Sequence, residues 1–167
     1  MNYAQIRKFD IANGPGVRTT LFVTGCTHNC KNCFNREYMD PNFGQPFTKE
    51  TEKLLIDYLH DDKVRGLSIL GGEPFQNEVG LIKFLTRLRR ETPKEIWIYS
   101  GYTFEEIMAV PIKRELLELC DVLVDGRFVD ELKNLKLKFR GSSNQRIIDI
   151  KKSLSENRVV LYGNYNE

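Results

Sequence analysis

Three of the four cysteines, Cys26, Cys30 and Cys33, lie within one eight-residue segment, CTHNCKNC. Three thiolates with no fourth cysteine nearby would leave one metal position open, and an open position is where a substrate binds. A zinc site completed by His28 is less favoured, because zinc sites usually draw two ligand pairs from separated segments. In a cubane iron–sulfur cluster, each thiolate binds a different iron and the fourth iron stays free. We therefore expect these cysteines to hold a catalytic iron–sulfur cluster.

Length and composition narrow the class of protein. The chain has 167 residues, which predicts one domain spanning 1–167. Its net charge is +2, from 25 basic and 23 acidic side chains, so the charge balance does not indicate binding to nucleic acid or to an anionic membrane. We interpret the basic run Lys133–Arg140 as a solvated face. With no signal peptide at the N-terminus and no membrane span, we expect a cytoplasmic protein whose thiols stay reduced.

Short apolar runs that alternate with helical segments predict an α/β fold with a parallel sheet of βα units. Helices are expected at 49–59 with Thr48 as N-cap, at 78–90, from the capping box at Thr103, and from Pro111 to Leu119. The strands are expected at Thr19–Val23, Leu67–Leu70, Ile96–Tyr99, Val122–Val124 and Ile147–Ile150, with Arg158–Tyr162 as a further candidate.

The first four predicted strands are each followed by residues with chemical potential. In a parallel sheet the carboxyl ends of the strands lie along one rim, where ligand sites form. The two glycines of the second segment are explained either by a tight turn or by close approach of the backbone to a ligand, and the shared rim favours the ligand. A carboxylate at Asp125 is costly after an apolar strand unless it has a partner or a rim position, and we favour a ligand contact. The four segments are the cysteine segment, Gly71-Gly72-Glu73-Pro74, Ser100-Gly101-Tyr102 and Asp125-Gly126-Arg127-Phe128.

Other conspicuous residues carry weaker signals. The polar run RGSSNQR at Arg140–Arg146 is explained equally well by a surface loop and by a site. Cys120 is expected to be a small buried residue at the start of the fourth strand, and Trp97 to be a core residue.

Taken together, these motifs resemble a known family. The C-x3-C-x2-C spacing, with GGEP one strand later, resembles the radical S-adenosylmethionine (SAM) superfamily. The segment NGPGVR at Asn13–Arg18 is similar to that of the activases of glycyl radical enzymes. Within that group, the segment Asp121–Phe128 and the RGSSNQR run most resemble activases of anaerobic ribonucleoside-triphosphate reductases. The superfamily usually has an aromatic residue before the third cysteine, whereas this chain has Asn32 there and Phe34 after Cys33.

The resemblance implies a fold and a set of ligands. The sheet would form a small, incomplete and open radical SAM barrel, since a closed barrel needs about 250 residues. The cysteines would bind a [4Fe-4S] cluster whose open iron chelates the amino and carboxylate groups of SAM. The backbone of Gly71-Gly72-Glu73 would receive the methionine amino group. Further SAM contacts are expected from Asn32, Cys33, Phe34, Ser100 and Asp125.

The resemblance also implies a reaction. One electron from the reduced cluster would cleave the C5′–S bond of SAM, giving methionine and a 5′-deoxyadenosyl radical. That radical would take a hydrogen atom from a glycine Cα of the partner reductase and leave a glycyl radical there. A one-electron donor such as flavodoxin would reduce the cluster. Alternatives are an activase of the pyruvate formate-lyase type, a small-molecule radical SAM enzyme such as a 7-carboxy-7-deazaguanine synthase, and a non-catalytic zinc module.

Overall fold

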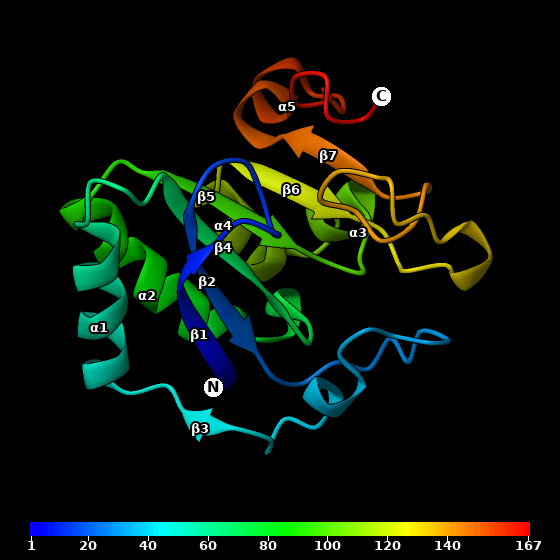
Figure 1. The fold of residues 1–167 in the computed structure, drawn as a ribbon. Coiled ribbons are helices and arrows are strands. Elements are labelled where there is room, and N and C mark those ends of the chain that lie inside the picture. Colours follow the sequence, from blue (N-terminus) through cyan, green and yellow to red (C-terminus); the bar gives the residue numbers. More distant parts are fainter.

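The computed structural model describes all residues, Met1–Glu167, and its strands form one open seven-stranded sheet in the order β3-β1-β2-β4-β5-β6-β7 (Figure 1). The four central strands run parallel to one another, which confirms the predicted α/β fold at the middle of the sheet. They are β2 (Arg18–Val23), β4 (Gly66–Gly71), β5 (Glu95–Tyr99) and β6 (Val122–Asp125).

The prediction of a parallel sheet is wrong at both edges. β1 (Asn2–Asp10) and β7 (Arg146–Asp149) each run antiparallel to their inner neighbour, and the short β3 (Gln45–Pro46) is antiparallel to β1. Parallel neighbours need a crossover connection, usually a helix. The chain instead reverses between β1 and β2 through the turn that contains NGPG, and no α-helix lies between β6 and β7.

The helices begin where the sequence supplies caps. They are α1 (Lys49–Leu59), α2 (Glu78–Glu91), α3 (Phe104–Met108), α4 (Pro111–Glu118) and α5 (Ile150–Glu156). Thr48 and Thr103 each form a capping box, and Pro111 opens α4, as predicted. None of these helices combines the length and the apolar character needed to cross a membrane.

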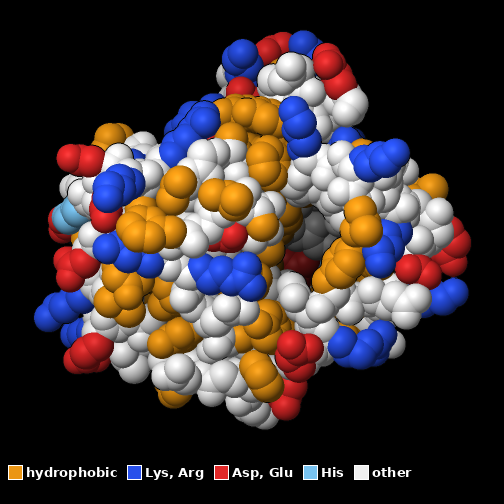
Figure 2. Space-filling model, viewed as in Figure 1, with side chains coloured by type: hydrophobic (Ala, Val, Ile, Leu, Met, Phe, Trp, Pro, Cys, Tyr) orange, Lys and Arg blue, Asp and Glu red, His pale blue; other side chains and the backbone are white.

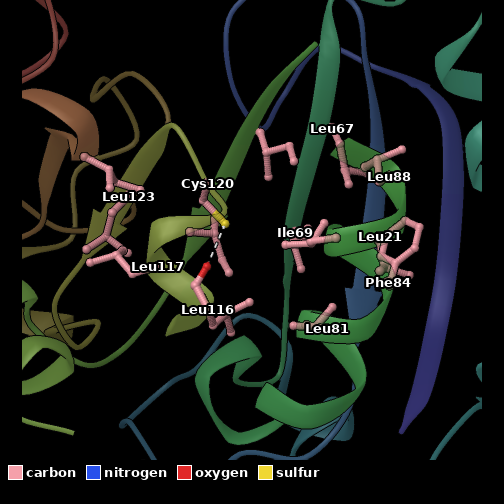
Figure 3. Packing of buried hydrophobic residues seen from close by; sticks show 14 of the residues in the cluster. Leu21, Leu67, Ile69, Leu81, Phe84, Leu88, Leu116, Leu117, Cys120 and Leu123 are labelled. Atoms are coloured by element: carbon pink, nitrogen blue, oxygen red, sulfur yellow. Dashed lines mark hydrogen bonds between the residues drawn. The ribbon is translucent and has the colours of Figure 1, made fainter. Parts of the chain in front are cut away.

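Alternate residues of the central strands form the main core against the helices. In Figure 3, Leu21, Leu67 and Ile69 of the sheet meet Leu81, Phe84 and Leu88 of α2, and Leu116 and Leu117 of α4 lie on the other side of the cluster. Each such buried side chain contributes about 1.5–3 kcal/mol. The buried Cys120 belongs to this cluster, with its thiol donating to the carbonyl of Leu116, as expected for a packing residue.

The opposite face of the sheet carries a smaller cluster around the buried Trp97, which confirms it as a core residue. The C-terminal tail packs here through Tyr162 and Tyr165. The predicted strand at 158–162 is wrong, because only one isolated bridge, Leu161 to Ile148, forms. The predicted fifth strand ends one residue early, since the Asp149 side chain caps α5 and Ile150 is already helical.

Candidate active site

A cavity of about 590 Å³ lies at the carboxyl ends of the central strands, and the half-buried Cys26, Cys30 and Cys33 all line it. Figure 2 shows a hollow in this face of the molecule. The other three predicted strand-end segments also contribute lining residues, which are Gly71, Gly72 and Glu73, Ser100 and Gly101, and Gly126 and Phe128. The cavity thus gathers the cysteines and motifs that the sequence had placed on one rim.

The cysteine loop folds through residues that tolerate positive φ angles. Asn29 and Asn32 have φ values of 54° and 56°, a left-handed conformation that asparagine adopts more readily than most residues. In the same loop, the Cys33 amide donates to the Cys30 carbonyl at 3.2 Å. The need for this turn accounts for asparagine, and not an aromatic residue, before the third cysteine.

The carboxylate of Glu73, only 1% exposed, fixes the cysteine loop to the ends of β4 and β5. It accepts hydrogen bonds from His28 Nε2 at 2.6 Å, from the Ser100 hydroxyl at 3.0 Å and from the amides of Gly101 at 2.7 Å and Phe75 at 2.8 Å. Four donor groups satisfy a carboxylate that would otherwise be costly to bury. His28, which could have completed a zinc site, is therefore committed to Glu73.

Small and polar neighbours shape the space around His28. A Cβ atom on Gly101 would lie 2.5 Å from the imidazole Cδ2, so only glycine leaves room for the ring. Tyr102 packs edge-on against the imidazole, with 4.5 Å between ring centroids. The Gln76 side chain accepts from the amide of Thr27 and donates to its hydroxyl, which adds a second tie to the same loop.

The paired glycines have a structural reason of their own. Gly71 has a φ of 125°, and a Cβ atom there would lie 2.2 Å from the carbonyl oxygen of Val23. A Cβ atom on Gly72 would lie 2.6 Å from the carbonyl oxygen of Gly25. Both residues also line the cavity. Close backbone packing at the ends of β2 and β4 thus requires glycine, whether or not a ligand is bound.

The donor set of the cavity fits an iron–sulfur cluster. Thiolates are the ligands of such clusters, and three thiols face one space. Burial raises the pKa of both Cys26 and Cys30, so the folded chain favours the neutral thiols until a cationic group stabilises the thiolates. Cys120 lies apart in the core and cannot join them.

Sequence comparisons agree with this site. Residues 12–148 match the family model described as a 4Fe-4S single cluster domain. The anaerobic ribonucleoside-triphosphate reductase-activating protein of Escherichia coli (strain K12) is 45% identical over 150 residues, which cover 87% of this chain and 96% of that protein. The proteins of that name from Pasteurella multocida (strain Pm70) and Enterobacteria phage T4 are each 40% identical, over 152 and 150 residues. These alignments cover 88% of this chain in both cases, and 96% and 93% of the two relatives. The chain belongs to the family of anaerobic ribonucleoside-triphosphate reductase-activating proteins.

In this activating-protein chain, Asp125 is buried and does not line the cavity. Its carboxylate accepts from the Arg146 guanidinium at 2.6 and 3.1 Å and from the Phe104 amide at 2.7 Å. Hydrogen bonds to Asp125 and Glu105 raise the pKa of Arg146. Asp125 therefore has the partner that a buried carboxylate needs. That partner is Arg146, the last residue of the RGSSNQR run, which lies too far along the chain for the sequence to indicate the pairing.

The segment between β6 and β7, residues 126–145, packs against the cysteine loop of the activating-protein chain. In Figure 1 the two extend side by side beyond the strand ends, and the Asn32 side chain donates to Asp130 at 3.0 Å. Phe34 packs on Phe128 with 4.9 Å between centroids, and Gly141 lies so close that a Cβ atom would be 3.0 Å from the Phe34 ring.

The RGSSNQR run mainly organises this segment of the activating-protein chain. The Gln145 side chain accepts from the amides of Gly141 and Ser142 and donates to the carbonyl of Gly126. Arg140, Gly141 and Gln145 also line the cavity. Both interpretations of the run, loop and site, therefore describe part of it.

Proposed function

We propose that this chain activates an anaerobic ribonucleoside-triphosphate reductase by radical SAM chemistry. One observation carries the proposal: three half-buried thiols line a cavity at the ends of four parallel strands, in a member of the activating-protein family. The whole chain, 1–167, would act as one radical SAM domain, with the open sheet as its incomplete barrel.

Cys26, Cys30 and Cys33 would hold a [4Fe-4S] cluster. When bound, that cluster supplies the electron that cleaves SAM to methionine and a 5′-deoxyadenosyl radical, which takes the glycine hydrogen of the reductase. The protein's own groups bind and orient the reactants. We assign SAM contacts to the backbone of residues 32–34 and 71–73 and to Ser100. Asp125, also predicted as a ligand contact, pairs with Arg146 and does not line the cavity, so we assign it no direct contact.

The side chains of the cavity suit transfer of a hydrogen atom. No general base is required, because no proton is abstracted, and the only imidazole at the cavity, His28, is committed to the Glu73 carboxylate. A one-electron donor such as flavodoxin would reduce the cluster, in a reducing cytoplasm that keeps the thiols available.

The proposal is tested by anaerobic reconstitution of the protein with iron and sulfide, followed by reduction and addition of SAM and the reductase. We expect a glycine-type doublet on the reductase in the electron paramagnetic resonance spectrum. Cleavage of SAM without that doublet would reject the reductase as partner and keep the chemistry. Zinc in place of iron, with neither signal, would reject the enzymatic function.

Two cysteine variants provide a matched comparison. Cys30→Ala should lose both iron and the doublet, because one of three ligands is missing. Cys120→Ala should retain both, since that thiol lies in the core and outside the cavity.

A further inference from the structure

Apolar side chains project into solvent around the mouth of the cavity. Leu135 is 84% exposed and Phe34 56% exposed, and both line the cavity. Ile11, 76% exposed, adjoins the lining residues Ala12 and Asn13 in the turn from β1 to β2, at the amino end of β2. Figure 2 shows hydrophobic surface on both sides of the hollow. Exposed apolar groups that gather around one opening mark an interaction site more often than single scattered ones.

The same rim is basic. The segment Lys133–Arg140, KNLKLKFR, has four cationic side chains and no acidic one. The Lys133 ammonium lies 5.2 Å from the centre of the Phe34 ring, so charge and apolar surface are interleaved. Arg140 of this segment lines the cavity, and Arg7, another lining residue, adds further positive charge. This arrangement complements a partner segment with an apolar centre and flanking carboxylates.

The rim is also held in place before any partner arrives. The Asn32 to Asp130 hydrogen bond and the Phe34 to Phe128 contact join the two loops that carry Phe34 and Leu135. Gly141 provides the space that lets these rings approach. A preorganised surface loses less conformational entropy on binding, which increases affinity for a given contact area.

A small ligand does not account for this surface. A cavity of about 590 Å³ is of the size that encloses a cofactor or metabolite, and groups inside it would make those contacts. Leu135 and Ile11 project outward, where only a second macromolecule would cover them. Burial of such side chains at the centre of an interface is a usual source of protein–protein affinity.

We propose that Ile11, Phe34 and Leu135, with the basic segment Lys133–Arg140, form the docking surface for the glycine-bearing segment of the reductase. This inference rests on the proposed function and adds to it the side chains that receive the partner. The segment that docks has apolar residues close to the reactive glycine and carboxylates on its flanks, and it enters the cavity between Ile11 and Leu135.

The test measures anaerobic binding of the reconstituted protein to immobilised reductase. Leu135→Asp and Ile11→Asp should each weaken binding ~10-fold, in the range found for central interface residues. The paired change Lys136→Glu and Lys138→Glu should weaken binding and reduce its dependence on salt. The matched control is Val79→Asp, on α2 and 69% exposed, which should bind within about twofold of the wild type because Val79 does not line the cavity and is not part of the proposed surface.

The outcomes separate the surface from the function. If the wild type binds the reductase and forms the glycyl radical, but Leu135→Asp and Ile11→Asp bind equally well, the docking surface is wrong and the function stands. If the wild type forms no radical on the reductase, the proposed function fails first. Thermal unfolding of each variant shows whether a loss of binding reflects lost structure, and the lysine pair tests the surface without touching an apolar residue.

Discussion

Glu73 accepts hydrogen bonds from donor groups of three separate segments: the cysteine loop, the turn after β4 and the turn after β5. A buried carboxylate in such a position has no alternative partners among the surrounding apolar groups. The residue therefore serves as a structural joint of the site, in addition to any contact with a ligand.

Replacing Glu73 by Gln tests this joint. Gly101 N and Phe75 N donate to different oxygens of the carboxylate, so the amide keeps an acceptor for one of them and turns its NH2 group toward the other. We expect urea denaturation to show a loss of about 1–3 kcal/mol, the cost of an unpaired buried polar group. Glu91→Gln, at an exposed position on α2, should lose almost nothing, and equal losses in the two variants would contradict the role of Glu73.

At the scale of elements, the site depends on how closely strand ends and turns approach one another. Gly71 is the clearest case, because its positive φ and its contact with Val23 both exclude a side chain. Gly71→Ala should lower the free energy of unfolding by at least about 2 kcal/mol, from backbone strain and steric overlap. Chemical denaturation measures this, and Gly80→Ala, inside α2, should cost much less, because its backbone is helical and the added Cβ would meet only the Met1 side chain, at 3.1 Å.

Gly101 leaves room for the His28 imidazole to reach the Glu73 carboxylate. Its backbone accepts alanine, but the new methyl group would displace the imidazole from Glu73. We expect Gly101→Ala to remain folded and yet to hold less iron after reconstitution, because the cysteine loop loses its tie to β5. Iron analysis checks this, and full iron occupancy in the variant would contradict it.

The central elements were predictable because each shows a local signal. In the apolar run Leu67–Leu70, all but the last residue are buried. At the helix caps, the side chains of Thr48 and Thr103 bond to the backbone only three residues further along the chain. β1 was missed because its alternation is interrupted by polar residues, most of its side chains being only partly buried. The Asp125–Arg146 pair was missed because it joins different elements, and nothing local indicates such a contact.

At the scale of the whole molecule, a buried polar network links the central strands to the C-terminal tail. Arg18, fully buried, bonds to Ser68 at 2.7 Å and pairs with Glu95 at 3.1 Å. Glu95 in turn accepts from Trp97 Nε1 and from the hydroxyl of Tyr162, at 2.7 and 2.9 Å. The C-terminal tail is thereby fastened to the first central strands.

This fastening should depend on pH. Burial and the hydrogen bond to Glu95 raise the pKa of Tyr162 from 10.0 to about 12. A raised pKa means that the stabilisation is complete below pH 10 and is lost as the pH rises through about 12. Tyr162→Phe should therefore be less stable than the wild type by about 1 kcal/mol at pH 8, with a difference that shrinks toward pH 12. Urea unfolding across this range checks it, with Tyr58→Phe on α1 as control, and a constant difference would contradict the assignment.

The cavity opens on the surface of the molecule (Figure 2). If the docking surface is correct, the reductase itself closes the site, and a radical formed before docking would meet solvent. Productive chemistry would then be limited by the partner, and SAM consumption should approach one molecule per glycyl radical only when the reductase is in excess. Counting 5′-deoxyadenosine against radical spins, with and without the reductase, would measure how much of the cofactor the uncovered protein wastes.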